Sequence, residues 1–334
     1  MPLLISIITP SYQQRAYLEE CLRSVHEQAY PYLEHIVVDG GSDDGSREVI
    51  EQHAHRLAWW CSEADRGQSD AINKGLGHAT GGVFSWLNSD DRLLPGALQA
   101  VGDAFAADPN LVVLEGHRLL ESPDGVQERS RLNDTARPDA LFIAPAVNQQ
   151  STFYHRDAVR AVGGVDPTLH YAMDLDLWWR VLFAYGPQHV STIPKDLAVF
   201  RLQPQSKTMR GAEAFVIETA ALLSAMAAAT GQHDLVELLA LGHAGMPAVR
   251  PSNAQAQHAA MIRRMVFRFV IKWNATVGSE KQFRLLKRLR SLAGDDPGMV
   301  EPELDARWRR MRTGLAAPGW TLYRAGRKLG LWSA

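Results

Sequence analysis

Short apolar runs alternate with amphipathic stretches through the first part of the chain. The apolar runs, which have the length and composition of buried strands, lie at residues 4–9, 35–39, 58–61 and 82–87. Between them, apolar side chains recur at the spacing of one helical face, at residues 16–28, 46–55 and 69–79. Alternation of strands with helices indicates an α/β fold, in which a mainly parallel sheet is covered by helices on both faces.

The pattern becomes mixed after residue 95 and helical after residue 212. Residues 111–114 predict a further strand, 122–137 a polar hairpin or loop, and 174–185 a helix rich in aromatic side chains. From residues 214–229 onward the apolar spacing is helical almost throughout. We therefore expect a main domain over residues 1–211, with halves 1–95 and 96–211, and a helical C-terminal region over 212–334.

Composition places the chain among ordinary globular proteins. Of its 334 residues, 46% are hydrophobic and 22% are charged. Cys21 and Cys61 are too few for a disulfide framework and suit a reducing compartment. No apolar run approaches the roughly 20 residues needed to span a bilayer. The N-terminus also lacks the positive leader of a signal peptide, so we expect a cytoplasmic enzyme.

Charge is distributed unevenly along the chain. The net charge is −2, but residues 255–334 hold 16 lysine and arginine residues against 6 aspartate and glutamate residues. Residues 261–273 place apolar side chains on one helical face, with Arg264, Arg268 and Lys272 in a basic stripe opposite. Such a helix suits peripheral contact with the inner, anionic face of a membrane. The alternative is packing on the acidic remainder of the chain or in an oligomer. We expect no nucleic-acid partner, because no recognition motif accompanies the charge.

The fourth apolar run ends abruptly in two adjacent carboxylates. It is followed by Asn88-Ser89-Asp90-Asp91. Paired hard oxygen ligands suit Mg²⁺ or Mn²⁺, which commonly bridges carboxylates to phosphate groups. The alternative is a surface turn, since asparagine, serine and aspartate all favour turns and helix caps.

Polar clusters also follow the first two apolar runs. Thr9-Pro10-Ser11-Tyr12 follows the first, and we expect Pro10 to end that strand because it lacks an N–H group. Asp39 closes the second run and is followed by glycines that allow close backbone approach. In open α/β sheets, ligands bind beyond the carboxyl ends of the strands. An aspartate there can accept a hydrogen bond from a base or a ribose.

A further cluster lies at residues 63–75, where the third helix begins. Asp70 is positioned to cap this helix. Lys74 can neutralise phosphate charge, although a solvated lysine is the alternative.

These four clusters, in this order, resemble the inverting, nucleotide-sugar-dependent glycosyltransferases of family 2, which have the GT-A fold. The resemblance runs from Ser6 to about Thr208. It implies that residues 1–95 bind the donor nucleotide and residues 96–211 the acceptor. Donor binding would fall to Thr9, Pro10, Tyr12, Asp39, Asp70, Lys74 and Asp90.

Within this resemblance, Asp91 is the metal ligand and Asp90 contacts the ribose. The family's first acidic position is Asn88 here, so we expect Asn88 to supply no charge and Asp91 to hold most of the Mn²⁺ or Mg²⁺. The segment 200–208 resembles one that often carries a metal-binding histidine, and this sequence has Gln203 there. Arg201 and Lys207 would close over the diphosphate as a mobile basic loop, unless they are simply exposed to solvent.

The acceptor side of the resemblance lies at residues 163–180. It implies that Asp174 is the general base, a role with a clear physical basis. A sugar hydroxyl must lose its proton as it attacks, and a carboxylate within hydrogen-bond reach typically accelerates that step by about 10²–10⁴-fold. A helix N-cap is the alternative for Asp174. Asp176 points to another helical face, and we expect it to be structural.

We therefore expect an inverting glycosyltransferase that moves a sugar from a nucleotide-diphospho-sugar, in particular a UDP-sugar, to an acceptor hydroxyl. The resemblance associates this activity with surface polysaccharide or glycolipid biosynthesis, with a sugar or lipid-linked glycan as acceptor. One alternative is a sugar nucleotidyltransferase, although no glycine-rich basic loop follows the first strand. The other is a non-catalytic nucleotide-sugar-binding protein, which Asn88 and Gln203 favour.

Overall fold

The chain forms two compact units in its computed structural model. The structure describes residues 3–125, 127–203, 211–274, 277–294, 300 and 302–329. One unit comprises residues 1–141 and 145–212, and the other residues 142–144 and 213–334.

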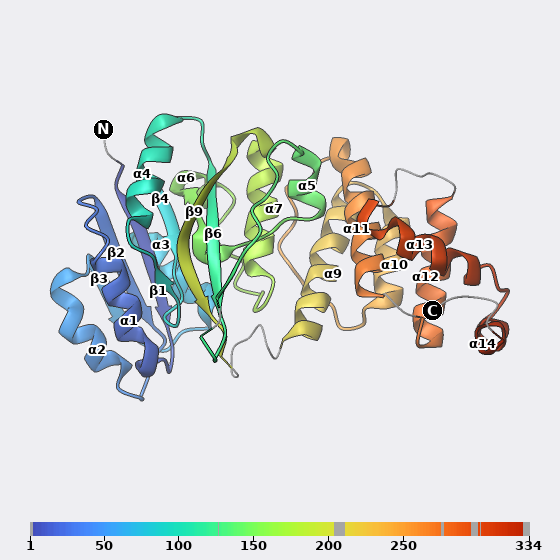
Figure 1. Cartoon of the computed structure of the whole chain (residues 1–334), viewed down its shortest axis with the longest axis horizontal. Coiled ribbons are helices and arrows are strands. Elements are labelled where there is room, and N and C mark those ends of the chain that lie inside the picture. Colours follow the sequence, from blue (N-terminus) through green and yellow to red (C-terminus); the bar gives the residue numbers. More distant parts are fainter. Residues whose placement is uncertain are drawn as a thin grey trace. The chain divides into compact units, whose positions relative to one another are not determined.

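The first unit begins with the predicted alternation of strands and helices (Figure 1). Its first four strands are β1 (Ile5–Ser11), β2 (Leu33–Asp39), β3 (Trp59–Ser62) and β4 (Val83–Trp86). They pair in the order β3-β2-β1-β4, and every pair is parallel. The helices between them are α1 (Arg15–His26), α2 (Ser46–His53) and α3 (Gln68–His78). These elements agree with the expected α/β fold.

The sheet continues beyond β4 with mixed pairing. Its further strands are β5 (Arg92–Leu93), β6 (Val113–Glu121), β7 (Gln127–Arg129), β8 (Thr152–His155) and β9 (Val190–Arg201). β8 is antiparallel to β4 and β6, and β6 and β9 are parallel. β7 folds back on β6, as expected for the polar hairpin. The remaining helices are α4 (Ala97–Ala107), α5 (Pro138–Ile143), α6 (Arg156–Ala161) and α7 (Met173–Tyr185).

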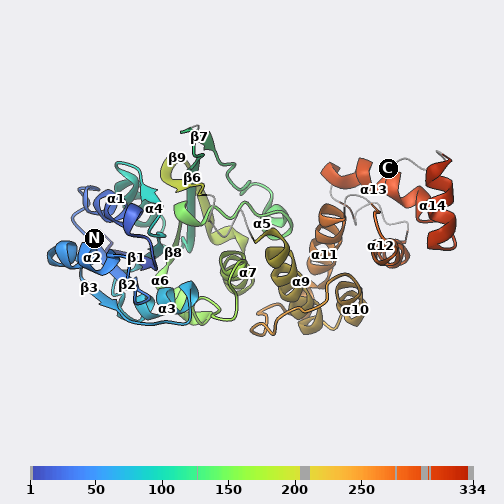
Figure 2. The same cartoon turned by 90° about the horizontal axis from the view of Figure 1, so that it is seen from below.

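Helices cover both faces of this sheet. Ile5 and Ile7 of β1 pack with buried residues of α1 and α4 in one core. Ile8 points to the opposite face, because successive strand side chains alternate. There it meets α3, whose Gly75 lies directly against it. Figure 2 shows α1 and α4 on one side of the strands and α3 on the other.

The second unit is helical, as its sequence pattern indicates. Its helices are α9 (Ala212–Ala229), α10 (His233–Gly242), α11 (Ala259–Trp273), α12 (Glu280–Ala293), α13 (Pro302–Gly314) and α14 (Trp320–Lys328). The sequence showed no bilayer-length apolar run. Among the described residues, however, α9 is long and apolar enough to cross a membrane, with a mean hydropathy of 1.5 over 18 residues. In the structure 44% of that helix is buried, and the core helix of a globular protein has the same properties.

Candidate active site

The parallel strands bring three of the predicted clusters to one edge of the sheet. Ser11 of β1 pairs with Asp39 of β2, and Ile8 pairs with Trp86 of β4. Because β1, β2 and β4 run in the same direction, the residues that follow them emerge side by side. Tyr12, Asp39 and the Asp90–Asp91 pair therefore share the carboxyl edge of the sheet.

Asp39 is fully buried at this edge and organises the loop that follows it. Its Oδ2 atom accepts hydrogen bonds from the backbone N–H groups of Gly41 (3.1 Å) and Ser42 (2.9 Å). Oδ2 also accepts from the Ser62 hydroxyl at 2.7 Å, and Oδ1 accepts from the Ser42 hydroxyl at 2.6 Å. With these donors in place, Asp39 shapes the loop, and a direct contact with a base would have to share Oδ1 with Ser42.

Tyr12 presents an open aromatic face beside this loop. Its side chain is 62% exposed. A Cβ atom on Gly40 would lie 3.2 Å from the Tyr12 ring and 3.0 Å from a carboxylate oxygen of Asp65, so the two side chains closely flank this glycine. The sequence did not single out Asp65, which the fold places next to Tyr12.

Thr9 and Pro10 are placed differently from Tyr12. Both are buried, and the Thr9 hydroxyl lies 3.0 Å from Nε2 of His35 inside the sheet. The role of Thr9 in the donor pocket stays a prediction, and in this structure its hydroxyl faces His35 of β2. Its side chain joins β1 to β2, because strand alternation turns it toward the interior.

The two adjacent carboxylates lie in a desolvated environment. Asp91 is only 2% exposed. It accepts hydrogen bonds from the backbone N–H of Arg201 (3.1 Å) and from Nδ2 of Asn88 (3.3 Å). The Gln150 side chain also forms a hydrogen bond with Asp91. Burial, and then the charge of Asp90, raise the pKa of Asp91 well above its ordinary value. Burial also raises the pKa of Asp90.

Asp90 and Asp91 together have the chemistry of a cation site. Within the described residues, no group of three or more histidine, cysteine or acidic side chains is placed to hold a metal ion. A buried carboxylate whose pKa is raised by a neighbouring carboxylate, as that of Asp91 is by Asp90, gains stability in its ionised form from a nearby cation. Asn88 adds no charge, and its Oδ1 already accepts from Nε2 of Gln68 at 2.6 Å. Asp91 and Asp90 are therefore the residues that fit a divalent ion.

Gln203 and Arg201 lie next to the Asp90–Asp91 pair. Nε2 of Gln203 donates to Oδ2 of Asp90 at 2.7 Å, so the amide nitrogen rather than the oxygen faces this carboxylate. The Arg201 guanidinium bonds Glu20 at 2.6 Å and stacks over Tyr17. A contact between Arg201 and a diphosphate would require this pairing to open. Lys207 lies outside the described residues.

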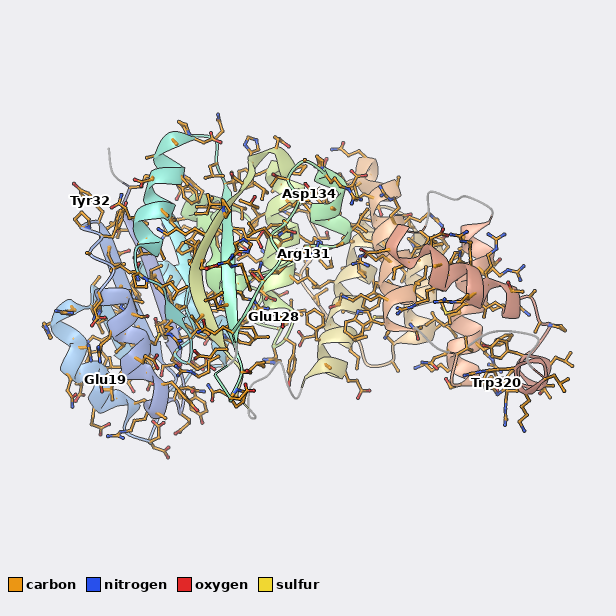
Figure 3. The ribbon with its side chains drawn as sticks, viewed as in Figure 1. Glu19, Tyr32, Glu128, Arg131, Asp134 and Trp320 are labelled. Carbon is orange, nitrogen blue, oxygen red and sulfur yellow. The ribbon has the colours of Figure 1, made fainter. Side chains whose placement is uncertain are left out.

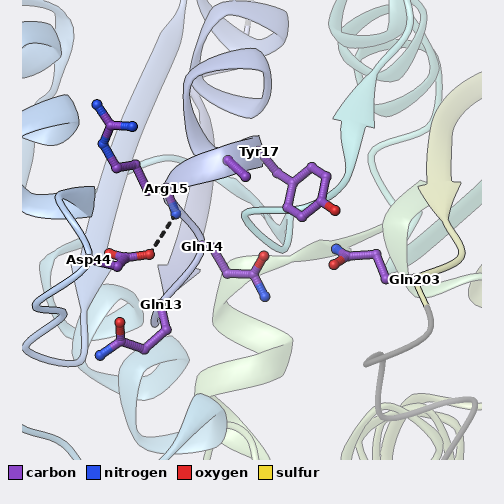
Figure 4. Close-up of a pocket in the computed structure, with 7 residues that line it drawn as sticks. Gln13, Gln14, Arg15, Tyr17, Asp44 and Gln203 are labelled. Carbon is purple, nitrogen blue, oxygen red and sulfur yellow. Dashed lines mark hydrogen bonds between the residues drawn. The ribbon is translucent and has the colours of Figure 1, made fainter.

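A cavity of about 490 Å³ opens next to Gln203 (Figure 4). Its other lining residues come from the start of α1 and from the loop after β2, namely Gln13, Gln14, Arg15, Ala16, Tyr17 and Asp44. Asp44 is held at its wall by the backbone N–H of Arg15, at 2.9 Å. Because Gln203 both lines this cavity and bonds Asp90, the cavity adjoins the carboxylate pair.

The charged residues of α3 are paired in the structure. Asp70 bonds the guanidinium of Arg66 at 2.7 Å, and Lys74 bonds Glu63 at 2.8 Å. Each pair is partly exposed, so a bound phosphate can compete with it at little cost.

Asp174 is half-buried at the start of α7. It is not the N-cap, which is Ala172. The start of α7 is tied to α3, because the Ser69 hydroxyl donates to the Leu169 carbonyl at 3.0 Å. Asp176 turns inward and pairs with Arg180 at 2.5 Å, as expected for a structural residue.

Arg118 connects the two halves of the site. Burial lowers the pKa of its guanidinium, whereas the charges of Asp91 and Asp174 both raise it. Two carboxylates that are distant in sequence thus act on one cation. The sequence analysis missed Arg118, together with Gln149 and Gln150. The signal in the sequence for the two glutamines was the polar run at residues 148–151. The structure shows that the side chains of this run are all buried.

Comparisons with known proteins agree with this fold. The model described as "Glycosyl transferase family 2" matches residues 6–162. Uncharacterized protein MT1568 of Mycobacterium tuberculosis is 29% identical over 228 residues, which are 62% of this chain and 70% of that protein. Uncharacterized glycosyltransferase RC0461 of Rickettsia conorii is 28% identical, over 56% of this chain and 32% of that protein. The "Putative teichuronic acid biosynthesis glycosyltransferase TuaG" of Bacillus subtilis is 39% identical over 92 residues, which are 27% of this chain and 36% of that protein.

Solved structures share the fold at low sequence identity. S. aureus TarS 1–349 in complex with UDP-GlcNAc has a TM-score of 0.58 and 16% identity, covering 96% of this chain and 87% of that chain. Mannosyltransferase PcManGT from Pyrobaculum calidifontis, in complex with GDP-Man and Mn²⁺, has a TM-score of 0.51 and 20% identity, covering 95% of this chain and 86% of that chain. The match over residues 6–162, the glycosyltransferase relatives and the shared fold together support a glycosyltransferase of family 2 with the GT-A fold.

Proposed function

We propose that this protein is an inverting glycosyltransferase that transfers a sugar from a UDP-sugar to an acceptor hydroxyl. The observation that carries the proposal is the position of Arg118, on which the charges of Asp91 and Asp174 both act. A donor-side carboxylate and a candidate base therefore both lie within electrostatic range of one cation, which fits a site where donor and acceptor meet. The TarS complex with UDP-GlcNAc supports a uridine donor by analogy of fold.

On the donor side, the exposed ring of Tyr12 offers a stacking face for the base, and Asp90 would accept a hydrogen bond from a ribose hydroxyl. Asp91, with Asp90 beside it, would hold Mn²⁺ or Mg²⁺. When bound, such an ion would neutralise negative charge on the diphosphate. The Mn²⁺ in the PcManGT complex supports this assignment by analogy.

On the acceptor side, Asp174 takes the proton of the attacking hydroxyl. The acceptor oxygen forms its bond to the anomeric carbon while the bond from that carbon to the diphosphate breaks. One displacement of this kind inverts the anomeric configuration. Asp174 suits the role because it is half-buried and α3 contacts hold the start of its helix in place.

Replacing Asp174 with asparagine tests the base assignment. We expect Asp174→Asn to bind UDP as tightly as the wild type and to lose about 10²–10⁴-fold in kcat, because only proton transfer is impaired. Asp157→Asn, at an exposed aspartate of α6, is the control.

The class of reaction should be identified from its products. Nucleoside diphosphate indicates glycosyl transfer, pyrophosphate indicates a nucleotidyltransferase, and no product from any nucleotide sugar indicates a binding protein. A kcat loss below tenfold would place the base elsewhere.

Replacing Asp91 with asparagine tests the metal assignment without changing the volume of the side chain. We expect Mn²⁺ to strengthen UDP binding in the wild type and in Asp157→Asn. In Asp91→Asn this effect should fall by at least about tenfold, since one charged ligand is worth several kcal/mol in a buried site. Calorimetric titration with UDP, with and without Mn²⁺, provides the measurement. An undiminished Mn²⁺ effect would rule out Asp91 as the ligand.

We also propose that α14 contacts an anionic membrane surface, which would suit a lipid-linked acceptor in polysaccharide or glycolipid assembly. Leu322 of α14 and Leu329, the residue that follows this helix, are 57% and 75% exposed. The neighbouring Tyr323 is buried against Phe283 of α12. Trp320, labelled in Figure 3, starts this helix, and Arg324 extends over its ring. Exposed leucines flanked by cations are typical of interfacial helices.

A further inference from the structure

Arg118, in the middle of β6, is a half-buried cation that no motif in the sequence marks. Its Nε atom donates to Oδ1 of Asn148 at 3.2 Å, and its guanidinium lies 4.8 Å from the centre of the Phe200 ring. These contacts use one edge and one face of the planar group. Within the described part of the chain, neither Nη atom makes a hydrogen bond or an ion pair.

Asn148 can offer only its oxygen to Arg118. Its Nδ2 atom donates to Oε1 of Glu115 and, at 2.9 Å, to the carbonyl of Arg131, which Figure 3 labels. Both amide hydrogens are therefore used, and the amide orientation follows from the network. Glu115 is fully buried and also bonds Nδ2 of Asn133 at 2.7 Å, which fixes its own position. Arg118 is thus held at Nε by a rigid, buried chain of contacts.

The same segment reaches the carboxylate pair. Nε2 of Gln149 donates to the carbonyl of Trp86 at 2.6 Å, and the Gln150 side chain bonds Asp91. Residues 148–150 therefore fix the guanidinium of Arg118 relative to Asp91. The charge of Asp174 also acts on Arg118.

A guanidinium presents paired donors in a fork that matches a phosphate or carboxylate group. Half-burying such a cation is costly unless a partner compensates it. Nearby carboxylates act on Arg118 through their charge, yet neither Asp91 nor Asp174 forms an ion pair with it in the structure. The free edge is thus preorganised, and it is not occupied by the protein's own carboxylates.

We propose that the Nη edge of Arg118 binds an anionic oxygen of the substrates, either a phosphate of the donor or an acidic group on the acceptor. The proposal rests on the glycosyltransferase function, because the region between Asp91 and Asp174 is where donor and acceptor would meet. Binding there would hold the two reacting groups in register and would select substrates that carry the anion.

Calorimetry on the full chain tests this site without requiring turnover. The probes are UDP with Mn²⁺, for the donor side, and sulfate added to the UDP–Mn²⁺ complex, for the acceptor side. The variants are Arg118→Ala, Arg118→Gln, which keeps part of the aliphatic stem, and Arg118→Lys. Arg129→Ala, at an exposed arginine of β7 paired with Asp196, is the matched control.

We expect the Ala and Gln variants to lose at least about tenfold in affinity for one probe, the range of a charged hydrogen bond. Arg118→Lys should recover only part of this loss, because lysine lacks the fork. Weaker UDP binding identifies the donor phosphate, whereas weaker sulfate binding with unchanged UDP binding identifies an acceptor anion. Wild-type affinity for both probes in a folded Arg118→Gln variant overturns the proposal, and so does full recovery by lysine. Failure of the proposed function is distinguishable, since it is read from the reaction products of the wild type.

Discussion

Folding raises the pKa of the Glu115 carboxyl group. It is fully buried in β6. Burial raises its pKa to about 7, although hydrogen bonds from Asn133 and Asn148 and the charge of Arg131 favour the ionised form. Burial, and then the charges of Asp174 and Glu115, raise the pKa of Tyr154 above its usual value. Glu115 therefore titrates near neutral pH, in a network that positions Arg118.

Stability should depend on pH through this residue. The folded-state pKa of about 7 lies above the ordinary value of 4.5, so between these values the folded protein binds the additional proton. The contribution of Glu115 is therefore complete below about pH 4.5 and is lost as pH rises through 7. We expect the stability of the wild type relative to Glu115→Gln to fall by about 3 kcal/mol across this window.

Urea titrations of both proteins at several pH values measure this difference. Glu128→Gln, at an exposed glutamate of β7, controls for general charge effects. A pH-independent difference between the wild type and Glu115→Gln would show that Glu115 keeps one protonation state throughout.

At the residue scale, the sequence predicted groups with a local signal. Asp91 stood out because two carboxylates end an apolar run. Glu115, Arg118 and Asn148 gave no such signal, because each acquires its role from partners more than ten residues away. For Thr9, the motif alone could not show that strand alternation turns its side chain inward.

At the element scale, the close packing of α3 on β1 keeps the donor-side loops together. A Cβ atom on Gly75 would lie 2.6 Å from Cγ2 of Ile8, so only glycine allows this approach. Gly77 on the same helix is exposed and has no heavy atom within 4 Å of the corresponding Cβ position. One helix thus contains two glycines in opposite environments.

These glycines provide a matched pair of substitutions. Alanine is normally favoured over glycine within a helix by about 0.5–1 kcal/mol. We expect Gly77→Ala to stabilise the protein by about that amount. Gly75→Ala should instead destabilise it by about 1–3 kcal/mol, because the methyl group overpacks the interface with Ile8. Thermal and urea denaturation measure both effects, and equal shifts of the two variants would contradict the packing.

The elements themselves differed in how far the sequence could predict them. The strands and helices of the first half were found because each has its own periodicity and is bounded by polar residues. The two-residue strand β5 was not found, nor was the insertion of β8 between β4 and β6. Those pairings depend on contacts between residues far apart in the chain, which no local pattern encodes.

At the scale of the whole molecule, charge and exposure suggest a second surface apart from the active site. The basic excess of residues 255–334 was readable from composition. The exposed apolar face of α14 was not, because it depends on which side of that helix packs on α12. With Tyr323 buried there, Leu322 and Leu329 are left facing solvent.

Vesicle sedimentation tests whether lipid covers this face. We expect the wild type to bind vesicles that contain phosphatidylglycerol, and to bind more weakly to phosphatidylcholine alone or at high salt, where charges are screened. Leu322→Glu/Leu329→Glu should reduce binding at least about tenfold, because two leucines no longer enter the interface. Leu241→Glu, at a partly exposed leucine of α10, is the control and should bind normally.

Arg324→Glu/Lys328→Glu separates the electrostatic contribution from the apolar one. Each lost cation removes about 1 kcal/mol of attraction to an anionic surface. This variant should therefore lose binding to phosphatidylglycerol vesicles and retain its weak binding to phosphatidylcholine. Sedimentation velocity on the same proteins examines the competing explanation, a second copy of the chain. If the leucine variant dissociates a dimer while vesicle binding is unchanged, α14 is a subunit contact and the membrane proposal is wrong.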